Sequence, residues 1–167
     1  MAIKFDFPPL LAPGYHTFDL AGVERLCVRP FSPASNRKFL YQHLEQMVQD
    51  LLLKGIRCSL WVDGSFLTEK ENPSDLDVIV VLDYDVTLSF TGEQKLFIED
   101  IGEMRYHPHI DSFVITLIPR GHPEYLTGEA DRADWARMYA VEHADYWLKG
   151  VAVIRLGEND VGLRINA

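Results

Sequence analysis

The stretch that decides the fold is WVDGSFLTEKENPSDLDVIVVL, residues 61–82. It leaves one apolar run, passes through a Gly-Ser pair and a polar loop, and enters a second apolar run behind two aspartates. Runs rich in β-branched and aromatic residues, bounded by turn residues, predict β-strands. We therefore expect strands over 58–62 and 75–83. The second is apolar on both faces beyond its first turn, which is typical of a strand covered on both sides of a sheet.

Working outward, the apolar spacing and the turn residues predict the remaining elements. Ser32 followed by proline predicts the cap and first turn of a helix that ends at Gly55. Further predicted elements are a helix over 93–102, a strand over 110–118, a loop over 121–132, a helix over 131–148 and a strand over 151–156. This order predicts a single α/β (α+β) domain with a small mixed β-sheet flanked by helices.

The first thirty-one residues differ in composition from the rest. Prolines at 8, 9, 13 and 30 predict an extended arm over 1–31, in front of a domain over 32–167. The arm is expected to pack through Phe5, Phe7, Leu10 and Phe18.

Composition narrows the class of protein. The net charge of −9, from 16 basic and 25 acidic residues, disfavours extended binding to DNA or other nucleic acids, although a local site for one nucleotide or RNA end stays open. The two cysteines lie in apolar contexts, which favours free thiols in a reducing compartment. The opening residues lack the pattern of a signal peptide, and no run is long enough for a membrane span. We therefore expect a cytoplasmic protein with no membrane association.

The two aspartates of the central stretch carry the strongest chemical signal. Side chains alternate across a strand, so Asp75 and Asp77 are expected to point to the same side. Two carboxylates this close repel, and one would take up a proton unless a cation compensated. A hard divalent ion, Mg²⁺ or Mn²⁺, suits such oxygen ligands. Asp111 opens the next apolar strand in the same manner and is expected beside the pair.

The Gly-Ser pair has a matching rationale. Gly64 lets the backbone approach a ligand closely. If a helix begins at this turn, its free N–H groups and the Ser65 hydroxyl form a site for phosphate. A phosphate site beside a carboxylate metal site is typical of phosphoryl or nucleotidyl transfer.

The ordered set WVDGSF, PSDLDVIVV and HIDSFVITL resembles the DNA-polymerase-β-type nucleotidyltransferase superfamily, and in particular a small, poorly characterised bacterial branch of it. The likeness covers most of the chain, including PPLLAPGYHTFDL and KGVAVIRL, while the specific motifs lie within residues 61–82. It implies that Asp75 and Asp77 bind the metals and the triphosphate, and that Asp111 binds the second metal and helps to deprotonate the acceptor. It also implies that Gly64 and Ser65 hold the terminal phosphates.

The resemblance further implies that a nucleoside triphosphate (NTP) donates NMP and releases pyrophosphate. A bare core of this size fits an acceptor hydroxyl on a protein or an RNA. Small cores of this type resemble toxin–antitoxin or phage-defence components.

Other residues have competing interpretations. The aspartates themselves fit a solvated acidic hairpin, in which residues 72–75 only make a turn. Asp63 is interpreted as a turn residue outside the site. His107 and His109 either face one ion or an acceptor, or face solvent. Cys58 is expected in the core. Five cations either supply positive charge for the triphosphate or the acceptor, or lie mostly at the surface: Arg120, His122, Arg132, Arg137 and Lys149.

Two further classes of function stay open. The first is a catalytically silent binding module that keeps the acidic site and regulates or neutralises a protein partner, as an antitoxin does. Its acidic surface suits a basic partner. The second is a structural protein whose acidic turn binds Ca²⁺ or nothing.

Overall fold

The computed structural model describes residues 7–139 and 148–157. Within them, one mixed sheet has the strand order β1-β5-β2-β3-β4. The strands are β1 (Gly14–Thr17), β2 (Cys58–Asp63), β3 (Leu76–Asp83), β4 (Ile110–Leu117) and β5 (Gly150–Leu156). The pairs β1–β5 and β3–β4 are parallel, and β5–β2 and β2–β3 are antiparallel. The predicted α/β (α+β) class with a small mixed sheet is confirmed.

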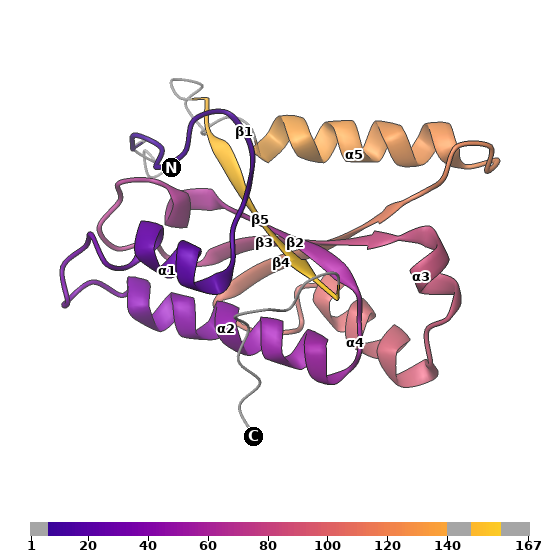
Figure 1. Ribbon diagram of the computed structural model, residues 1–167, viewed down its shortest axis with the longest axis horizontal. Coiled ribbons are helices and arrows are strands. Elements are labelled where there is room, and N and C mark those ends of the chain that lie inside the picture. The colour runs from indigo at the N-terminus through magenta and orange to yellow at the C-terminus, as the bar shows by residue number, and fades with distance from the viewer. Residues whose placement is uncertain (1–6, 140–147, 158–167) are drawn as a thin grey trace.

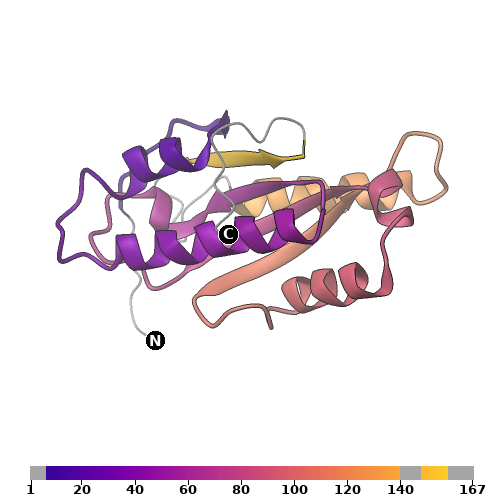
Figure 2. The same ribbon diagram turned by 60° about the horizontal axis from the view of Figure 1, so that its bottom comes forward.

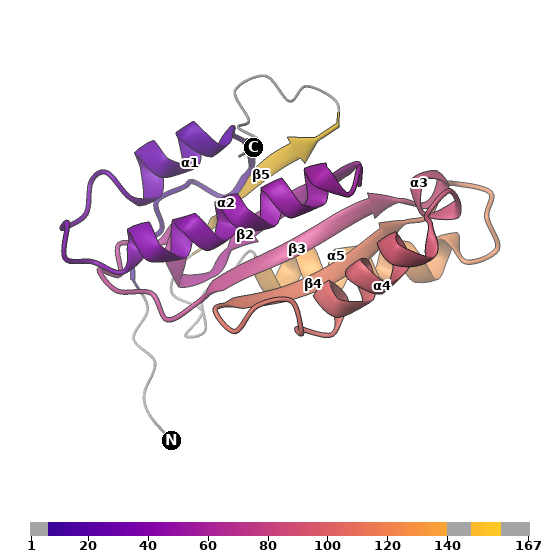
Figure 3. The ribbon, with the colours of Figure 1, turned by 90° about the horizontal axis from the view of Figure 1, so that it is seen from below.

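Helices lie on both faces of this sheet. They are α1 (Leu20–Cys27), α2 (Arg37–Leu53), α3 (Tyr84–Leu88), α4 (Gly92–Gly102) and α5 (Tyr125–Tyr139), with a 3₁₀ turn, η1, over Gly64–Leu67. Figure 1 shows α5 along one face and α1, α2 and α4 on the other. Figure 2 shows α1 beside α2, and Figure 3, from below, shows α2 and α4 in front of the sheet with α5 behind.

Two apolar cores follow from strand alternation. Leu76, Val78, Val80 and Leu82 of β3 join the core beneath α1, α2 and α4. Ile79 and Val81 of the same strand join a second core, in which Trp135 of α5 packs on Phe113 with ring centroids 4.6 Å apart. Strand β3 is apolar on both faces because both faces are covered, as its sequence predicts.

The prediction of an extended arm over residues 1–31 is wrong in its second half. Gly14–Thr17 pairs with β5, and Leu20–Cys27 is a helix capped by the Asp19 carboxylate, which accepts from the Gly22 amide at 2.6 Å. All the prolines lie outside residues 20–27, and Leu20, Val23 and Cys27 recur at helical spacing on the buried side. The prediction rested on the composition of all thirty-one residues, and it therefore missed a helix that contains no proline.

The helices differ from prediction in three further places. Helix α2 begins at Arg37, because residues 32–35 close a separate turn in which the Ser35 amide donates to the Ser32 carbonyl. The residues between β3 and the predicted helix over 93–102, for which no element is predicted, contain α3. Helix α5 begins at Tyr125, within the predicted loop, and residues 140–147 of the predicted helix lie outside the described residues.

Candidate functional site

The register of the sheet places three aspartates side by side. Asp63 at the end of β2 is paired with Asp77 of β3, and Asp77 is paired with Asp111 of β4. Cβ atoms of residues directly opposite one another lie about 4.5–5.5 Å apart. By strand alternation the three side chains share the sheet face covered by α5. The prediction that Asp111 lies beside Asp77 is confirmed.

Asp75 lies one residue before β3 and is half-buried. Strand alternation therefore does not fix the direction of its side chain, and its predicted sharing of a ligand with Asp77 stays a prediction. Among the described residues, no three His, Cys, Asp or Glu side chains converge on a position for a metal ion.

The Gly-Ser turn is built directly against Asp77. Gly64 has φ of +73°, which favours glycine, and a Cβ placed on it would lie 1.7 Å from Asp77 Oδ2 and 2.6 Å from Asp77 Cγ. The carboxylate thus occupies the space that any other residue at position 64 would need for its side chain. The turn continues as the four-residue 3₁₀ helix η1 rather than as an α-helix, and the phosphate site expected at Gly64 and Ser65 stays a prediction. Gly64 and Ser65 still lie next to the aspartates.

Arg37 stabilises this turn through hydrogen bonds to backbone carbonyls. Its side chain is fully buried and donates six hydrogen bonds to five backbone carbonyls, which belong to Cys27, Ser65, Phe66, Thr68 and Lys70. The Phe31 ring lies 3.6 Å from its Cζ atom. Burial lowers the pKa of Arg37 to about 10, so the side chain stays charged at neutral pH. A guanidinium suits this role because its planar fork carries five donors.

The lead-in segment lies beside the same turn. The Leu10 amide donates to the Leu67 carbonyl at 2.8 Å, and the Glu69 amide donates to the Pro8 carbonyl at 2.8 Å. The proline-rich start of the chain therefore closes one side of the Gly-Ser turn.

Asp63 and Lys149 are the site residues that the sequence analysis missed. Lys149 Nζ lies 3.2 Å from Asp63 Oδ2, and the two side chains are 7% and 3% exposed. Burial raises the pKa of Asp63 to about 7, with Asp77 raising it further, while Lys149 and the Gly64 amide lower it. The available signal is local: Asp63 ends one apolar strand and Lys149 immediately precedes another, so both charged side chains adjoin apolar runs.

The predicted histidine pair has a third member. His43 of α2 lies against His107 and His109, with ring centroids 4.0 and 5.7 Å away, and Phe39 packs on His43 at 4.4 Å. Both loop histidines are half-buried in this cluster, so they are partly shielded from solvent, and the alternative that they face an ion or an acceptor stays a prediction. Burial, and then the neighbouring imidazoles, lower the pKa of His43 and of His107.

The remaining candidate side chains lie where they were expected, apart from Lys149. Cys58 and Cys27 are buried free thiols. Arg132 pairs with Glu129, and Arg137 pairs with Asp134, within helix α5.

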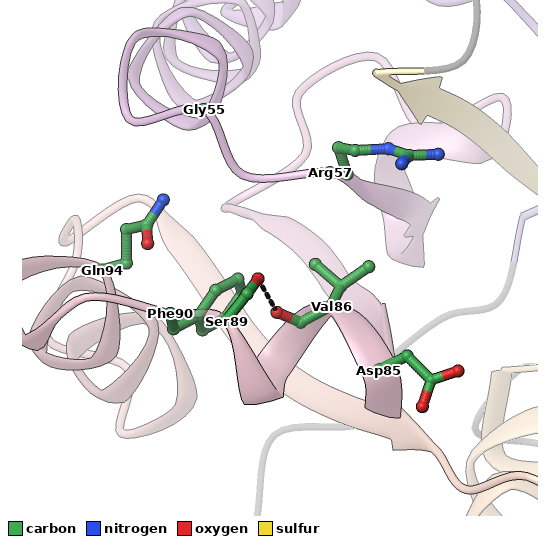
Figure 4. Close-up of a pocket in the computed structure, with 7 residues that line it drawn as sticks. All are labelled: Gly55, Arg57, Asp85, Val86, Ser89, Phe90 and Gln94. Carbon is green, nitrogen blue, oxygen red and sulfur yellow. Dashed lines mark hydrogen bonds between the residues drawn. The ribbon is translucent and has the colours of Figure 1, made fainter.

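A pocket of about 370 Å³ lies at the other end of the sheet (Figure 4). Its lining residues are Gly55, Arg57, Asp85, Val86, Ser89, Phe90 and Gln94. They precede β2 or follow β3, whereas Asp63 and Asp77 lie at the opposite ends of these strands. The pocket is therefore separate from the row of aspartates, and it contains none of the predicted site residues.

Comparison with known proteins gives a family. Residues 3–155 match a family of unknown function, DUF6932. The chain belongs to this family. No curated protein and no solved structure matches it. In the described parts of the chain, no helix combines the length and the apolar character needed to cross a membrane.

The row of aspartates carries the type of ligand that a divalent cation of the Mg²⁺ type prefers, although among the described residues no three such side chains converge on one position. Mg²⁺ and Mn²⁺ prefer carboxylate oxygens, and Asp63, Asp77 and Asp111 supply these from three adjacent strands. Asp63 Oδ1 is buried and has no hydrogen-bond partner. A buried carboxylate oxygen without a donor is uncommon in folded proteins.

Proposed function

We propose that this protein is a metal-dependent nucleotidyltransferase of the DNA-polymerase-β type, which moves NMP from an NTP to a hydroxyl group. The observation that carries the proposal is the register of β2, β3 and β4, which sets Asp63, Asp77 and Asp111 abreast while Gly64 packs on the Asp77 carboxylate. An acidic hairpin exposed to solvent has no need of this close backbone approach. The arrangement favours a site over a turn.

Each residue has a distinct role in the proposed reaction. Asp77 and Asp111, with Asp75 at the entrance, would hold Mg²⁺ or Mn²⁺, and Gly64 and Ser65 would contact the terminal phosphates. When bound, the ion neutralises the triphosphate and stabilises the charge that develops on the leaving oxygens. The acceptor oxygen attacks the α-phosphorus, the bond to pyrophosphate breaks, and Asp111 takes the hydroxyl proton. Asp111 suits this last step because its side chain is exposed, at the open end of the row.

The acceptor is proposed to be a hydroxyl group on a protein or at an RNA end. The net charge of −9 disfavours a long nucleic-acid track, whereas one hydroxyl presented by a macromolecule needs only the exposed Asp111 edge. Such a modification by a small cytoplasmic core fits a toxin–antitoxin or phage-defence system, with a protein partner.

One observation favours a second candidate, a catalytically silent binding module. Lys149 supplies a fixed positive charge to Asp63 inside the protein. A site that carries its own cation has less need of a metal. In this case the acidic face would serve to bind a basic protein partner.

Calorimetry with ATP, GTP, CTP and UTP, with and without Mg²⁺, tests the proposal. We expect saturable, Mg²⁺-dependent binding of at least one NTP that Asp77→Asn abolishes. Asp83→Asn, which removes a carboxylate from the far end of the same strand, is the matched control and should bind normally. Transfer of label from α-³²P-labelled NTP to protein or RNA would then identify the acceptor. No binding of any NTP by folded protein would refute the enzyme and leave the binding module.

A further inference from the structure

Four aromatic side chains form a cluster that has no role in the proposed reaction. Phe39 and His43 come from α2, and His107 and His109 come from the loop before β4. Ring centroids lie 4.0 Å apart for His43 and His107, 4.4 Å for Phe39 and His43, and 5.1 Å for Phe39 and His109. Phe39 is 46% exposed, and the three imidazoles are half-buried. This ring cluster therefore presents aromatic rings to solvent.

Packing stability alone does not explain the ring cluster. His43 Nε2 is buried and has no hydrogen-bond partner among the described residues, and a buried nitrogen without a partner lowers stability. An apolar side chain at this position would pack without that cost. Phe39 lies outside the core, which α2 joins through neighbours such as Leu40 and Leu44. The chain thus keeps four rings together where burial does not require them.

The ring cluster suits a flat aromatic ligand. Burial, and then the neighbouring imidazoles, lower the pKa of His43 and of His107, so these two rings are uncharged at neutral pH. Proteins recognise the unpaired bases of RNA by stacking them on phenylalanine, tyrosine, tryptophan and histidine rings. Stacking on a single base needs no track of Lys and Arg, so it is compatible with the net charge of −9.

The ring cluster adjoins the aspartate row at the edge where Asp111 lies. The Leu76 amide donates to the His109 carbonyl at 3.0 Å, which places His109 at the start of β3 and β4. Asp111 follows His109 by two residues, about 6–7 Å of extended chain. The ring cluster lies on the α2 side of the sheet (Figure 3), so a ligand that touches it and Asp111 crosses the end of the sheet.

The position also separates the ring cluster from the residues assigned to the donor. The Gly-Ser turn follows β2, and β3 lies between β2 and β4 in the sheet. In the proposed function, Gly64 and Ser65 contact the phosphates of the NTP, whereas Asp111 takes the proton of the acceptor. A ligand on the ring cluster is therefore on the acceptor side of the row.

We propose that the ring cluster stacks on the terminal base of a single-stranded RNA and thereby brings the hydroxyl group of that RNA end to Asp111. Binding of the base stands on the ring cluster itself, whereas its part in transfer rests on the proposed function. The inference narrows the acceptor, from a hydroxyl on a protein or an RNA, to an RNA end.

Hexa-adenylate RNA is the probe. The full-length protein is titrated with it in the absence of NTP, while NMR follows the Hε1 resonances of the histidines, assigned with single His→Gln variants. Phe39→Ala removes the exposed ring, and Phe39→Trp keeps an aromatic ring there. Leu53→Ala, which removes an exposed apolar side chain from the other end of α2, is the matched control. Calorimetry with NTP and Mg²⁺ on the same variants reports on the donor site, and thermal unfolding establishes that they are folded.

We expect the resonances of the three clustered histidines to shift, and those of His16 and His122, which lie outside the ring cluster, to stay in place. RNA affinity should fall by about 5- to 100-fold in Phe39→Ala, because a base loses its stacking partner. It should be kept in Phe39→Trp and in Leu53→Ala, and NTP binding should be unchanged in all three variants.

The outcomes separate the inference from the proposed function. Normal NTP binding with no RNA binding, or with RNA affinity unchanged in Phe39→Ala, would overturn the inference and leave a transferase with a protein acceptor. Loss of NTP binding in Phe39→Ala would also overturn it, because the ring cluster would then hold the base of the donor. RNA binding that depends on Phe39, in a protein that binds no NTP, would uphold the ring cluster as an RNA site and refute the transferase.

Discussion

Replacing Gly64 with alanine tests the contact on which the site depends. A Cβ at position 64 would lie 1.7 Å from Asp77 Oδ2, whereas real Cβ atoms essentially never approach a neighbour within 3.0 Å. The Asp77 carboxylate must therefore retreat by at least about 1.3 Å. A misplacement of about 1 Å in a catalytic site can cost about 100-fold in rate. We expect Gly64→Ala to lose Mn²⁺ and NTP binding, at least tenfold, in a folded protein.

Gly55 offers a matched control. It has φ of +65°, close to the +73° of Gly64, but a Cβ placed on it would meet nothing within 4 Å. Both alanine variants incur the left-handed backbone penalty of about 1–2 kcal/mol. Only Gly64→Ala must also displace a packed side chain, which adds about 1 kcal/mol for an unfavourable rotamer. For a chain of this length, each kcal/mol corresponds to about 2–4 °C in melting temperature.

Urea unfolding monitored by tryptophan fluorescence measures both free energies, and Mn²⁺ titration measures binding. The reasoning requires Gly55→Ala to bind normally with a modest loss of stability, and Gly64→Ala to lose more stability together with binding. Equal unfolding free energies and unchanged binding in the two variants would refute it, because Asp77 would not then lie against Gly64.

Three further predictions concern the rest of the chain. Arg37→Lys should lower the free energy of unfolding by about 3–5 kcal/mol, because three ammonium donors cannot serve five buried or partly buried carbonyls. Exposed Arg57→Lys is the control, and a stable Arg37→Lys in urea would contradict this role of Arg37. Because the pKa of His43 is lowered in the folded state, the unfolded state binds more protons near pH 6, so stability should fall as pH drops through about 6.5. Urea midpoints at pH 7.5 and 5.5 should differ less in His43→Gln than in the natural protein, and an identical difference would exclude His43 as a cause. Burial raises the pKa of Cys27 and Cys58 to about 12. Both thiols should therefore react with a disulfide reagent at pH 8 only after unfolding. Rapid labelling of the folded protein would contradict this, because it would show that the thiols are accessible.

The strands could be predicted because their signals are local. Residues 58–62, 75–83 and 110–118 are short apolar runs bounded by turns, and each of them forms a strand within a residue or so of the prediction. The apolar residues on both faces of β3 also predict that both faces are buried. The Gly-Ser turn and the two aspartates follow from the same stretch, so the centre of the candidate site needed no tertiary knowledge.

The contact between Lys149 and Asp63, which the sequence analysis missed, depends on pairing between strands that are distant in the sequence. Nothing near Lys149 shows that β5 inserts between β1 and β2, yet this insertion brings the ammonium group to Asp63. Asp63 was interpreted as a turn residue because glycine and serine follow it. The sheet instead ends on Asp63 and buries it. His43 joins His107 and His109 in the same way, from a helix more than sixty residues away in sequence.

The charges of the aspartate row bear on the proposed metal site. When all are ionised, Asp63, Asp77 and Asp111 together with Lys149 carry two negative charges in a setting that is partly closed to water. Burial of a carboxylate is unfavourable unless a cation or a proton compensates, and the raised pKa of Asp63 expresses that cost. On the proposed function, a divalent cation at Asp77 and Asp111 would lower the repulsion along the row. Lys149 does not by itself argue against a metal, because Asp63, the carboxylate with which it pairs, is not one of the ligands that the proposed function assigns.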